Sequence, residues 1–400
     1  MILEILLAII IGCILGTITG ITPGVHINLV AALIFSISSA LLEYTDVIFL
    51  IITITSMAIT HTFLDILPST FLGAPNEENA ISALPAHRLL LQGKAGEAIR
   101  LATIGSYFGL LISVLLAPLI FYIVTLSYPI IKSYIAALLI FISIYIIWTS
   151  KNKLSAAILF TITGVLGVVV FNIKTLDQPL FPLLSGLFGT SSLMISLKTE
   201  TKIPIQEKIT KIIINKITLT KNTLVSLISS ILTSFLPGLT NSHTTLVASI
   251  ISKTKDEREY LIINNSINTI SMILSFIALF SIDKARNGAV VVISNFVEKF
   301  TLIYLILLLN CSLVAGFIAV MLVLKLSTIF SKIITKINYS KLCIGIMLFL
   351  TILVIIMTGY VGIIVLITAT FIGIMPKLLE IENTHLMGCL ILPVILYFIL

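Results

Sequence analysis

The sequence predicts an all-α, polytopic integral membrane protein with about 10 to 13 membrane segments. Of its 400 residues 58% are hydrophobic and only 10% are charged, and the mean hydropathy is +1.19. Soluble domains are about a quarter charged, and no single soluble core hides this much apolar surface. Two further observations favour the prediction: apolar runs of membrane length recur along the chain, and a Pro-Gly pair interrupts the opening run of each half.

The first apolar run extends from Leu3 to Leu42. As one helix it would be about 60 Å long, roughly twice the hydrocarbon thickness of a bilayer. Residues 20–26, GITPGVH, contain its break, because Pro23 removes a backbone donor and Gly24 permits a turn. We therefore expect two helix ends to meet at an uncharged turn, with His26 and Asn28 opening the second helix.

A third span is expected from Val47 to about Thr60, and it runs into the polar stretch 60–98. In lipid, irregular backbone persists only where protein or a water-filled cavity satisfies its polar groups. The stretch is therefore either a re-entrant functional segment or an ordinary extramembrane loop, and the sequence leaves both open. Its candidate residues are Asp65, Ser69, Thr70, Gly73, Asn76, Glu77, Glu78 and His87.

Residues 198–221 hold six lysines and two glutamates, and they divide the chain nearly in half. The positive-inside rule places this basic linker in the cytoplasm. It separates an expected first membrane repeat, 1–197, from a second, 222–400. In a membrane protein the excess of basic residues, net charge +7, marks cytoplasmic loops, so it does not indicate nucleic acid.

The second half opens as the first does. An apolar run from Leu224 leads to Pro237 and Gly238, followed by Asn241, Ser242 and His243. Asn264 and Asn268, in the next span, are four residues apart and share a helical face. The matching breaks indicate an internal repeat with discontinuous helices, which is the best sequence pointer to the binding site of a secondary transporter.

Half-helix N-termini at the two breaks would present backbone N–H groups and a positive dipole end, which suits an anion such as a carboxylate. Each polar residue also has a structural explanation. The histidines can cap helices, and the asparagines can hold helices together. Asp65, Glu77 and Glu78 are candidates for coupling to a proton or sodium ion, although acids near a helix N-terminus are also stabilising without any function. The predicted substrate-binding residues are Pro23, Gly24, His26, Asn28, Ser69, Thr70, Gly73, Asn76, Pro237, Gly238, Asn241, Ser242, His243, Asn264 and Asn268.

No metal site and no cofactor are expected. Cys13, Cys311, Cys343 and Cys389 stand singly in apolar runs. The sequence has no H-E-x-x-H, G-x-S-x-G or P-loop motif. The alternative function is a membrane-embedded enzyme that uses Asp65, Glu77, Glu78 and His87, and we consider it the weaker hypothesis because no further matched ligands follow.

Several segments resemble the permease family of the tripartite tricarboxylate transporters, the large TctA-type subunit, and in particular its archaeal stand-alone branch. They are 16–31, GTITGITPGVHINLVA; 92–98, QGKAGEA; 236–238, LPG; and 264–268 with 286–289, RNGA. The resemblance implies two inverted repeats and ion-driven uptake of carboxylates through the cell membrane. It also implies a small membrane subunit and an extracytoplasmic solute-binding protein as possible partners, and a homodimer is possible.

Overall fold

The chain is helical throughout its regular elements, within the residues that the structure describes. The computed structural model describes residues 2–22, 27–72, 83–132, 134–176, 178–198, 204–207, 215–234, 241–254, 256–334, 339–381 and 383–399. The fold-class prediction of an all-α membrane protein is confirmed at this level.

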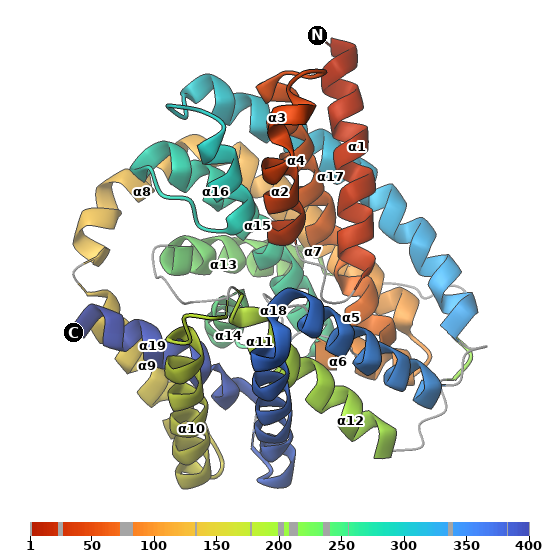
Figure 1. The fold of residues 1–400 in the computed structure, drawn as a ribbon, viewed down its shortest axis with the longest axis vertical. Coiled ribbons are helices and arrows are strands. Elements are labelled where there is room, and N and C mark those ends of the chain that lie inside the picture. Colours follow the sequence, from red (N-terminus) through yellow and green to blue (C-terminus); the bar gives the residue numbers. More distant parts are fainter. Residues whose placement is uncertain are drawn as a thin grey trace.

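Among the described residues, thirteen elements precede the basic linker, and Figure 1 shows their arrangement. They are α1 (Ile2–Ile21), α2 (Ile27–Ser36), α3 (Ser38–Leu41), α4 (Val47–Leu64), α5 (Ile66–Leu72), α6 (Ala83–Leu91), α7 (Ala95–Leu115), α8 (Ala117–Lys132), α9 (Ile135–Thr149), α10 (Lys153–Phe171), α11 (Leu180–Leu184), the π-helix η1 (Ser185–Thr190) and α12 (Ser191–Lys198).

Eight elements follow it in the part of the second half that the structure describes. They are α13 (Lys216–Ser234), α14 (Asn241–Ser252), α15 (Glu257–Ile282), α16 (Gly288–Asn295), α17 (Leu302–Ile334), α18 (Tyr339–Leu378), the 3₁₀-helix η2 (Asn383–Met387) and α19 (Gly388–Ile399). The helix α13 starts at Lys216, inside the segment 198–221 that was expected to be linker.

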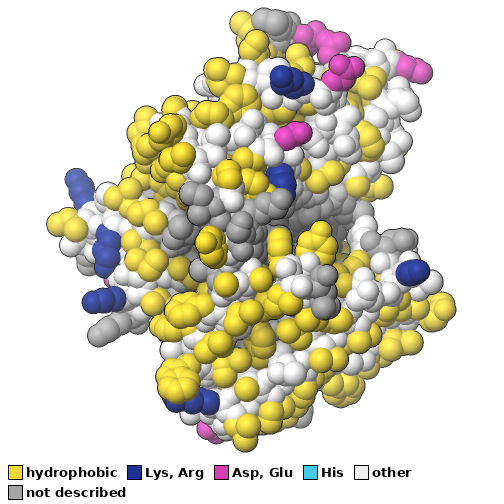
Figure 2. Space-filling view, turned by 90° about the vertical axis from the view of Figure 1, so that its left-hand side faces the viewer, with side chains coloured by type: hydrophobic (Ala, Val, Ile, Leu, Met, Phe, Trp, Pro, Cys, Tyr) yellow, Lys and Arg dark blue, Asp and Glu magenta, His cyan; other side chains and the backbone are white. Residues whose placement is uncertain are grey.

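Seven helical segments are long and apolar enough to cross a membrane, and four shorter apolar helices accompany them, among the residues described. The seven are Ile2–Ile21, Val47–Phe71, Ala95–Leu115, Lys153–Phe171, Glu257–Ile282, Leu302–Ile333 and Cys343–Leu378. Figure 2 shows hydrophobic side chains over most of one face, with acidic side chains at its upper end. An outer surface of this kind is what a lipid-embedded protein requires.

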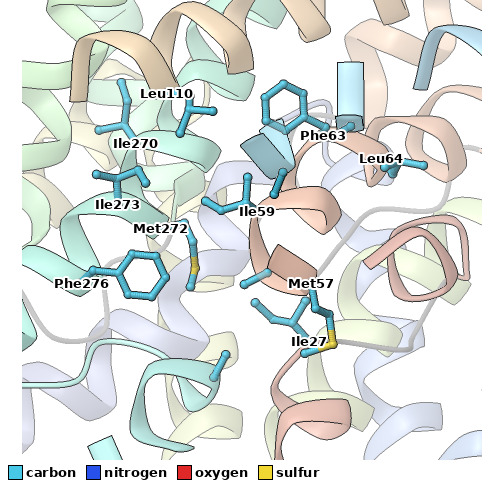
Figure 3. Packing of buried hydrophobic residues seen from close by; sticks show 14 of the residues in the cluster. Ile27, Met57, Ile59, Phe63, Leu64, Leu110, Ile270, Met272, Ile273 and Phe276 are labelled. Carbon is cyan, nitrogen blue, oxygen red and sulfur yellow. The ribbon is translucent and has the colours of Figure 1, made fainter. Parts of the chain in front are cut away.

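The helices form two bodies along the long axis of the molecule (Figure 1). The upper body contains α1, α4, α7, α15 and α17, which share the largest hydrophobic core. Figure 3 shows Ile59 and Phe63 of α4 in this core, near Leu110 of α7 and Ile270 of α15. The lower body packs α10, η1, α18 and α19 around a second core.

In the upper body, helices of the first half of the chain pack on helices of the second half, and we call this arrangement reciprocal packing. The helix α7 packs on α15, and α17 packs on α4; α1 also contacts α17, and α13 contacts α7. The closest packing is at glycines. A Cβ at Gly12 or Gly16 of α1 would overlap the backbone of α4, and one at Gly105 of α7 would overlap Ile262 of α15.

At the first predicted break the structure describes the end of α1, and the breaks themselves fall on residues 23–26 and 235–240, which lie outside the described residues. The helix α1 ends at Ile21 and α2 begins at Ile27, while α13 ends at Ser234 and α14 begins at Asn241. Pro23, Gly24, Pro237 and Gly238 themselves lie outside the described residues.

The third span differs from the prediction that it ends near Thr60. The helix α4 continues to Leu64, and α5 extends the buried segment to Phe71, so residues 47–71 form one candidate span. The reason is that the polar side chains of this stretch, His61 and Asp65 among them, are buried against other helices instead of facing solvent.

Candidate functional site

Asp65 lies at the junction of α4 and α5, inside a candidate span. Its backbone N–H still bonds to the His61 carbonyl at 3.0 Å, and α5 begins one residue later. The residue is 4% exposed. A carboxylate at such a place is costly unless other groups donate hydrogen bonds to it, so its partners define the candidate site.

Asn268 of α15 supplies the principal donor. Its side-chain nitrogen donates to Asp65 Oδ2 at 2.7 Å and also reaches the Thr62 carbonyl at 3.3 Å. Asn268 Oδ1 in turn accepts a bond of 3.1 Å from the side-chain nitrogen of Asn241, the first residue of α14. The three side chains form a chain of hydrogen bonds from α4 through α15 to α14, and each is buried.

A second bond extends this cluster along α14. Thr245, one turn after Asn241, donates to Asn264 Oδ1 at 3.1 Å. Directly after Asn268, Thr269 pairs its hydroxyl with that of Thr62 at 3.2 Å. We call Asp65, Asn241, Thr245, Asn264 and Asn268 the polar cluster.

The residues of the polar cluster come from both halves of the chain. Asp65 is a first-half residue, and the other four lie in the second half. A carboxylate that accepts a charge-assisted bond, in surroundings of low dielectric, responds strongly to any change in that bond. The cluster therefore combines an ionisable side chain with amide donors inside the helical bundle.

Three predicted residues take other partners. Ser69 donates to the Asp65 carbonyl at 3.0 Å, within its own helix. The buried hydroxyl of Thr70 makes no hydrogen bond, whereas its carbonyl lies 2.9 Å from His87 Nδ1. Burial lowers the pKa of His87 below its ordinary value of 6.5, and the bond to Thr70 opposes this shift. His87 is therefore neutral at pH 7, with Nδ1 as the donor.

Asn28 does not join the polar cluster through any contact described for it. Its Oδ1 accepts a bond of 3.0 Å from the backbone N–H of Ala289, in the first turn of α16. Asn287 caps the same turn at Val290. A Cβ at Gly288 would meet the Asn28 side chain at 2.8 Å, so the glycine permits this approach. Asn28 thus ties α2 to the start of α16.

The remaining predicted site residues cannot be placed. Pro23, Gly24, His26, Gly73, Asn76, Glu77, Glu78, Pro237 and Gly238 lie outside the described residues, and so do the side chains of Ser242 and His243, whose backbone is in α14. Among the residues that are described, no three His, Cys, Asp or Glu side chains gather as metal ligands would.

Sequence reasoning missed several residues of the site and its surroundings. Thr245 had a signal, because it lies four residues after Asn241 on the same helical face. Glu97 also had one, as the acid of the QGKAGEA segment. Glu97 is 6% exposed, and its Oε1 lies 2.6 Å from Arg258 Nε. This ion pair joins the start of α7 to the start of α15.

The fold and the cluster define a polytopic membrane protein whose two halves meet at a buried carboxylate and its amide donors. The chain belongs to the tripartite tricarboxylate transporter TctA family, whose sequence profile matches residues 6–388. It is similar to a protein of Methanocaldococcus jannaschii named "Uncharacterized protein MJ1079", with 31% identity over 389 residues that cover 94% of each chain. No solved structure matches it.

Proposed function

We propose that this protein is a permease that carries a small organic anion, a carboxylate, across the cell membrane, driven by a proton or sodium gradient. Its membership of a transporter family supports the class. The observation that carries the proposal is the bond from Asn268 to Asp65, continued to Asn241, because it places an ionisable group and amide donors together inside a helical membrane bundle.

In this proposal Asp65 takes up the coupling ion. A proton on Asp65, or a sodium ion beside it, removes the negative charge that would repel an anionic substrate nearby. Asn241 and Asn268 then donate to the substrate carboxylate. The remaining predicted binding residues, those at the two Pro-Gly breaks included, complete the site, and Glu77 and Glu78 are further candidates for coupling.

We further propose that residues 1–197 and 222–400 are inverted repeats, and that transport proceeds by movement of one against the other. The lower body supports a repeat. A Cβ at Gly167 of α10 would meet the Cys389 carbonyl of α19, and one at Gly388 of α19 would meet Phe160 of α10. Likewise a Cβ at Gly373 of α18 would meet the Leu187 carbonyl of η1, and one at Gly186 of η1 would meet Leu366 of α18.

These two helix pairs use the same residue spacing. Phe160 precedes Gly167 by the same interval as Leu366 precedes Gly373, and Gly186 and Leu187 are adjacent, as are Gly388 and Cys389. Each pair joins a helix from one half to a helix from the other. An exchange of equivalent elements between two repeats explains this pattern, and it resembles the reciprocal packing of the upper body.

The family name also suggests partners. In tripartite systems the large subunit works with a small membrane subunit and a solute-binding protein, and we propose that this chain accepts such subunits or forms a homodimer. Co-expression and co-purification with candidate subunits tests this part separately from transport.

The experiment for the central proposal is uptake of labelled carboxylates, citrate, succinate and acetate, into vesicles that contain the purified protein. We expect accumulation that requires a proton or sodium gradient. Asp65→Asn should abolish accumulation yet retain exchange of labelled for unlabelled substrate, because only the coupling step is lost. Asn241→Ala should weaken both, and Asn310→Ala, an asparagine on an outward face of α17, should change neither.

Uptake that is insensitive to collapse of both gradients would overturn the coupling. Transport of none of the carboxylates would overturn the substrate class. If Asp65→Asn accumulates substrate as well as the original chain does, the coupling residue is another acid.

A further inference from the structure

A groove of about 370 Å³ lies between α7 and α17, on residues that the polar cluster does not use. Its walls are apolar and include Ile104, Tyr107, Phe317, Val320 and Leu324. Arg100 lines the same groove. The site therefore combines a cation with an apolar groove.

The groove opens on an outward face of the bundle. Phe317 is 58% exposed and Leu324 is 38% exposed, and Val314 and Met321 extend the same face of α17. Both helices are candidate spans. Exposed apolar side chains on a membrane span face lipid chains, so the groove is reached from within the bilayer.

The two helices run in opposite directions along the groove. Leu110 lies against Gly316, while Arg100 shares the groove with Leu324, further along α17. Because α7 begins at Ala95 and rises 1.5 Å per residue, Arg100 lies about 8 Å from the start of this helix. Lys325 and Lys332 lie near the end of α17, so the charged end of the groove is at a basic end of the bundle.

We propose that this groove binds an anionic phospholipid, with its phosphate at Arg100 and part of one acyl chain between α7 and α17. The occupant must be negative at one end and apolar along the rest, and it must come from the bilayer. A guanidinium presents five N–H donors, so a phosphate can bind while Arg100 keeps its contacts with the protein. Basic pockets between spans on the cytoplasmic side are suited to such head groups.

The probes are phosphatidylglycerol and phosphatidylcholine, offered together to the purified full chain, with bound lipid counted by native mass spectrometry. We expect one phosphatidylglycerol to be retained in preference to phosphatidylcholine. Arg100→Gln should reduce that preference about ten-fold, because a charge-assisted bond is lost. Lys325→Gln, next to the groove but not in its lining, is the matched control and should have little effect.

A second variant tests the apolar part without changing charge. Val320→Trp fills the groove and should prevent retention of the lipid, whereas Met321→Trp adds the same bulk at an exposed residue that does not line the groove and should not. Equal losses for Arg100→Gln and Lys325→Gln would mean a general surface attraction and would overturn the proposal. So would undiminished retention in Val320→Trp, or displacement of the lipid by soluble glycerol 3-phosphate, which would indicate an anion site with no need of a chain.

Discussion

Asn268 is the residue on which the polar cluster depends, because it donates to Asp65 and accepts from Asn241 with one side chain. Its two roles are not interchangeable. Without the amide nitrogen the Asp65 carboxylate loses a buried donor, and without the amide oxygen Asn241 loses an acceptor. A buried polar group left unsatisfied costs about 1–3 kcal/mol.

We therefore predict that Asn268→Ala lowers the free energy of unfolding by about 1–3 kcal/mol. The loss should be smaller when Asp65→Ala is already present, since the carboxylate that needs the donor is then absent. Thermal unfolding of the four chains of this cycle in one detergent measures the coupling. Additive losses would show that the two side chains do not interact in the folded protein.

The cluster also shows where sequence reasoning stops at this scale. Asp65, Asn264 and Asn268 stand out in the sequence because polar residues inside apolar runs are costly and usually functional. Their pairing does not, because Asp65 and Asn268 are 203 residues apart. No local pattern records which of several buried amides meets the carboxylate, and for Asn28 the outcome is a different one, the start of α16.

At the scale of the helices, close contacts between neighbouring helices occur at glycines as well as at polar pairs. Gly167 of α10 and Gly373 of α18 allow a neighbouring backbone to approach closely, whereas a Cβ at Gly345, also in α18, would meet nothing within 4 Å. Gly167→Ala and Gly373→Ala should each destabilise the protein by similar amounts, if the two helix pairs are equivalent.

Gly345→Ala serves as the control for that experiment. It should be neutral or stabilising by up to about 1 kcal/mol, because alanine favours the helix. Melting temperatures of the three variants give the comparison. A loss at Gly167 with none at Gly373 would contradict the equivalence and would weaken the proposal of repeats.

Two ion pairs join the first half of the chain to the start of α15, and they differ in exposure. Arg88–Glu257 has side chains 63% and 33% exposed, whereas Arg258–Glu97 has values of 39% and 9%. Water screens the first pair more strongly than the second. The difference in burial therefore predicts a difference in strength.

Double-mutant cycles should give a coupling of about 0.2–1 kcal/mol for Arg88–Glu257. For Arg258–Glu97 we expect about 1–3 kcal/mol, since the acid is buried and the bond is charge-assisted. The charge changes are Arg88→Gln with Glu257→Gln, and Arg258→Gln with Glu97→Gln. Equal couplings, both suppressed by salt, would mean that Glu97 is as well solvated as Glu257.

The segment 204–207 adds hydrogen bonds to this junction, and these bonds give part of the QGKAGEA segment, residues 92–98, a structural role. Gln206 accepts from the Ala95 N–H at 3.0 Å and donates to the Leu90 carbonyl at 3.1 Å. Gly93, between them, has a positive φ of 81°, which favours glycine. The sequence identified the segment only by resemblance, because its partner Gln206 lies 111 residues beyond Ala95.

At the scale of the whole molecule, the two ends of the upper body differ in their basic residues, while the acids Glu97 and Glu257 at the basic end are in ion pairs. Arg88, Lys94 and Lys325 lie at the end where α7 begins and α17 finishes. Glu4, Glu43 and Asp46 lie where α1 and α4 begin, and these two helices run parallel, because Gly12 contacts Thr53 and Gly20 contacts Leu64. From the positive-inside rule we predict that the first end is cytoplasmic and that the second faces outward.

Single cysteines test this orientation in intact cells, with a maleimide that does not cross the membrane. Tyr44→Cys, at a position 86% exposed on the acidic end, should be labelled from outside. Ile205→Cys, 89% exposed and beside the start of α7, should be labelled only after the membrane is opened. The four native cysteines are buried and free, so the unmodified chain should give little background. Labelling of Ile205→Cys in sealed cells, with Tyr44→Cys protected, would reverse the orientation, and with it the leaflet from which the lipid at Arg100 comes.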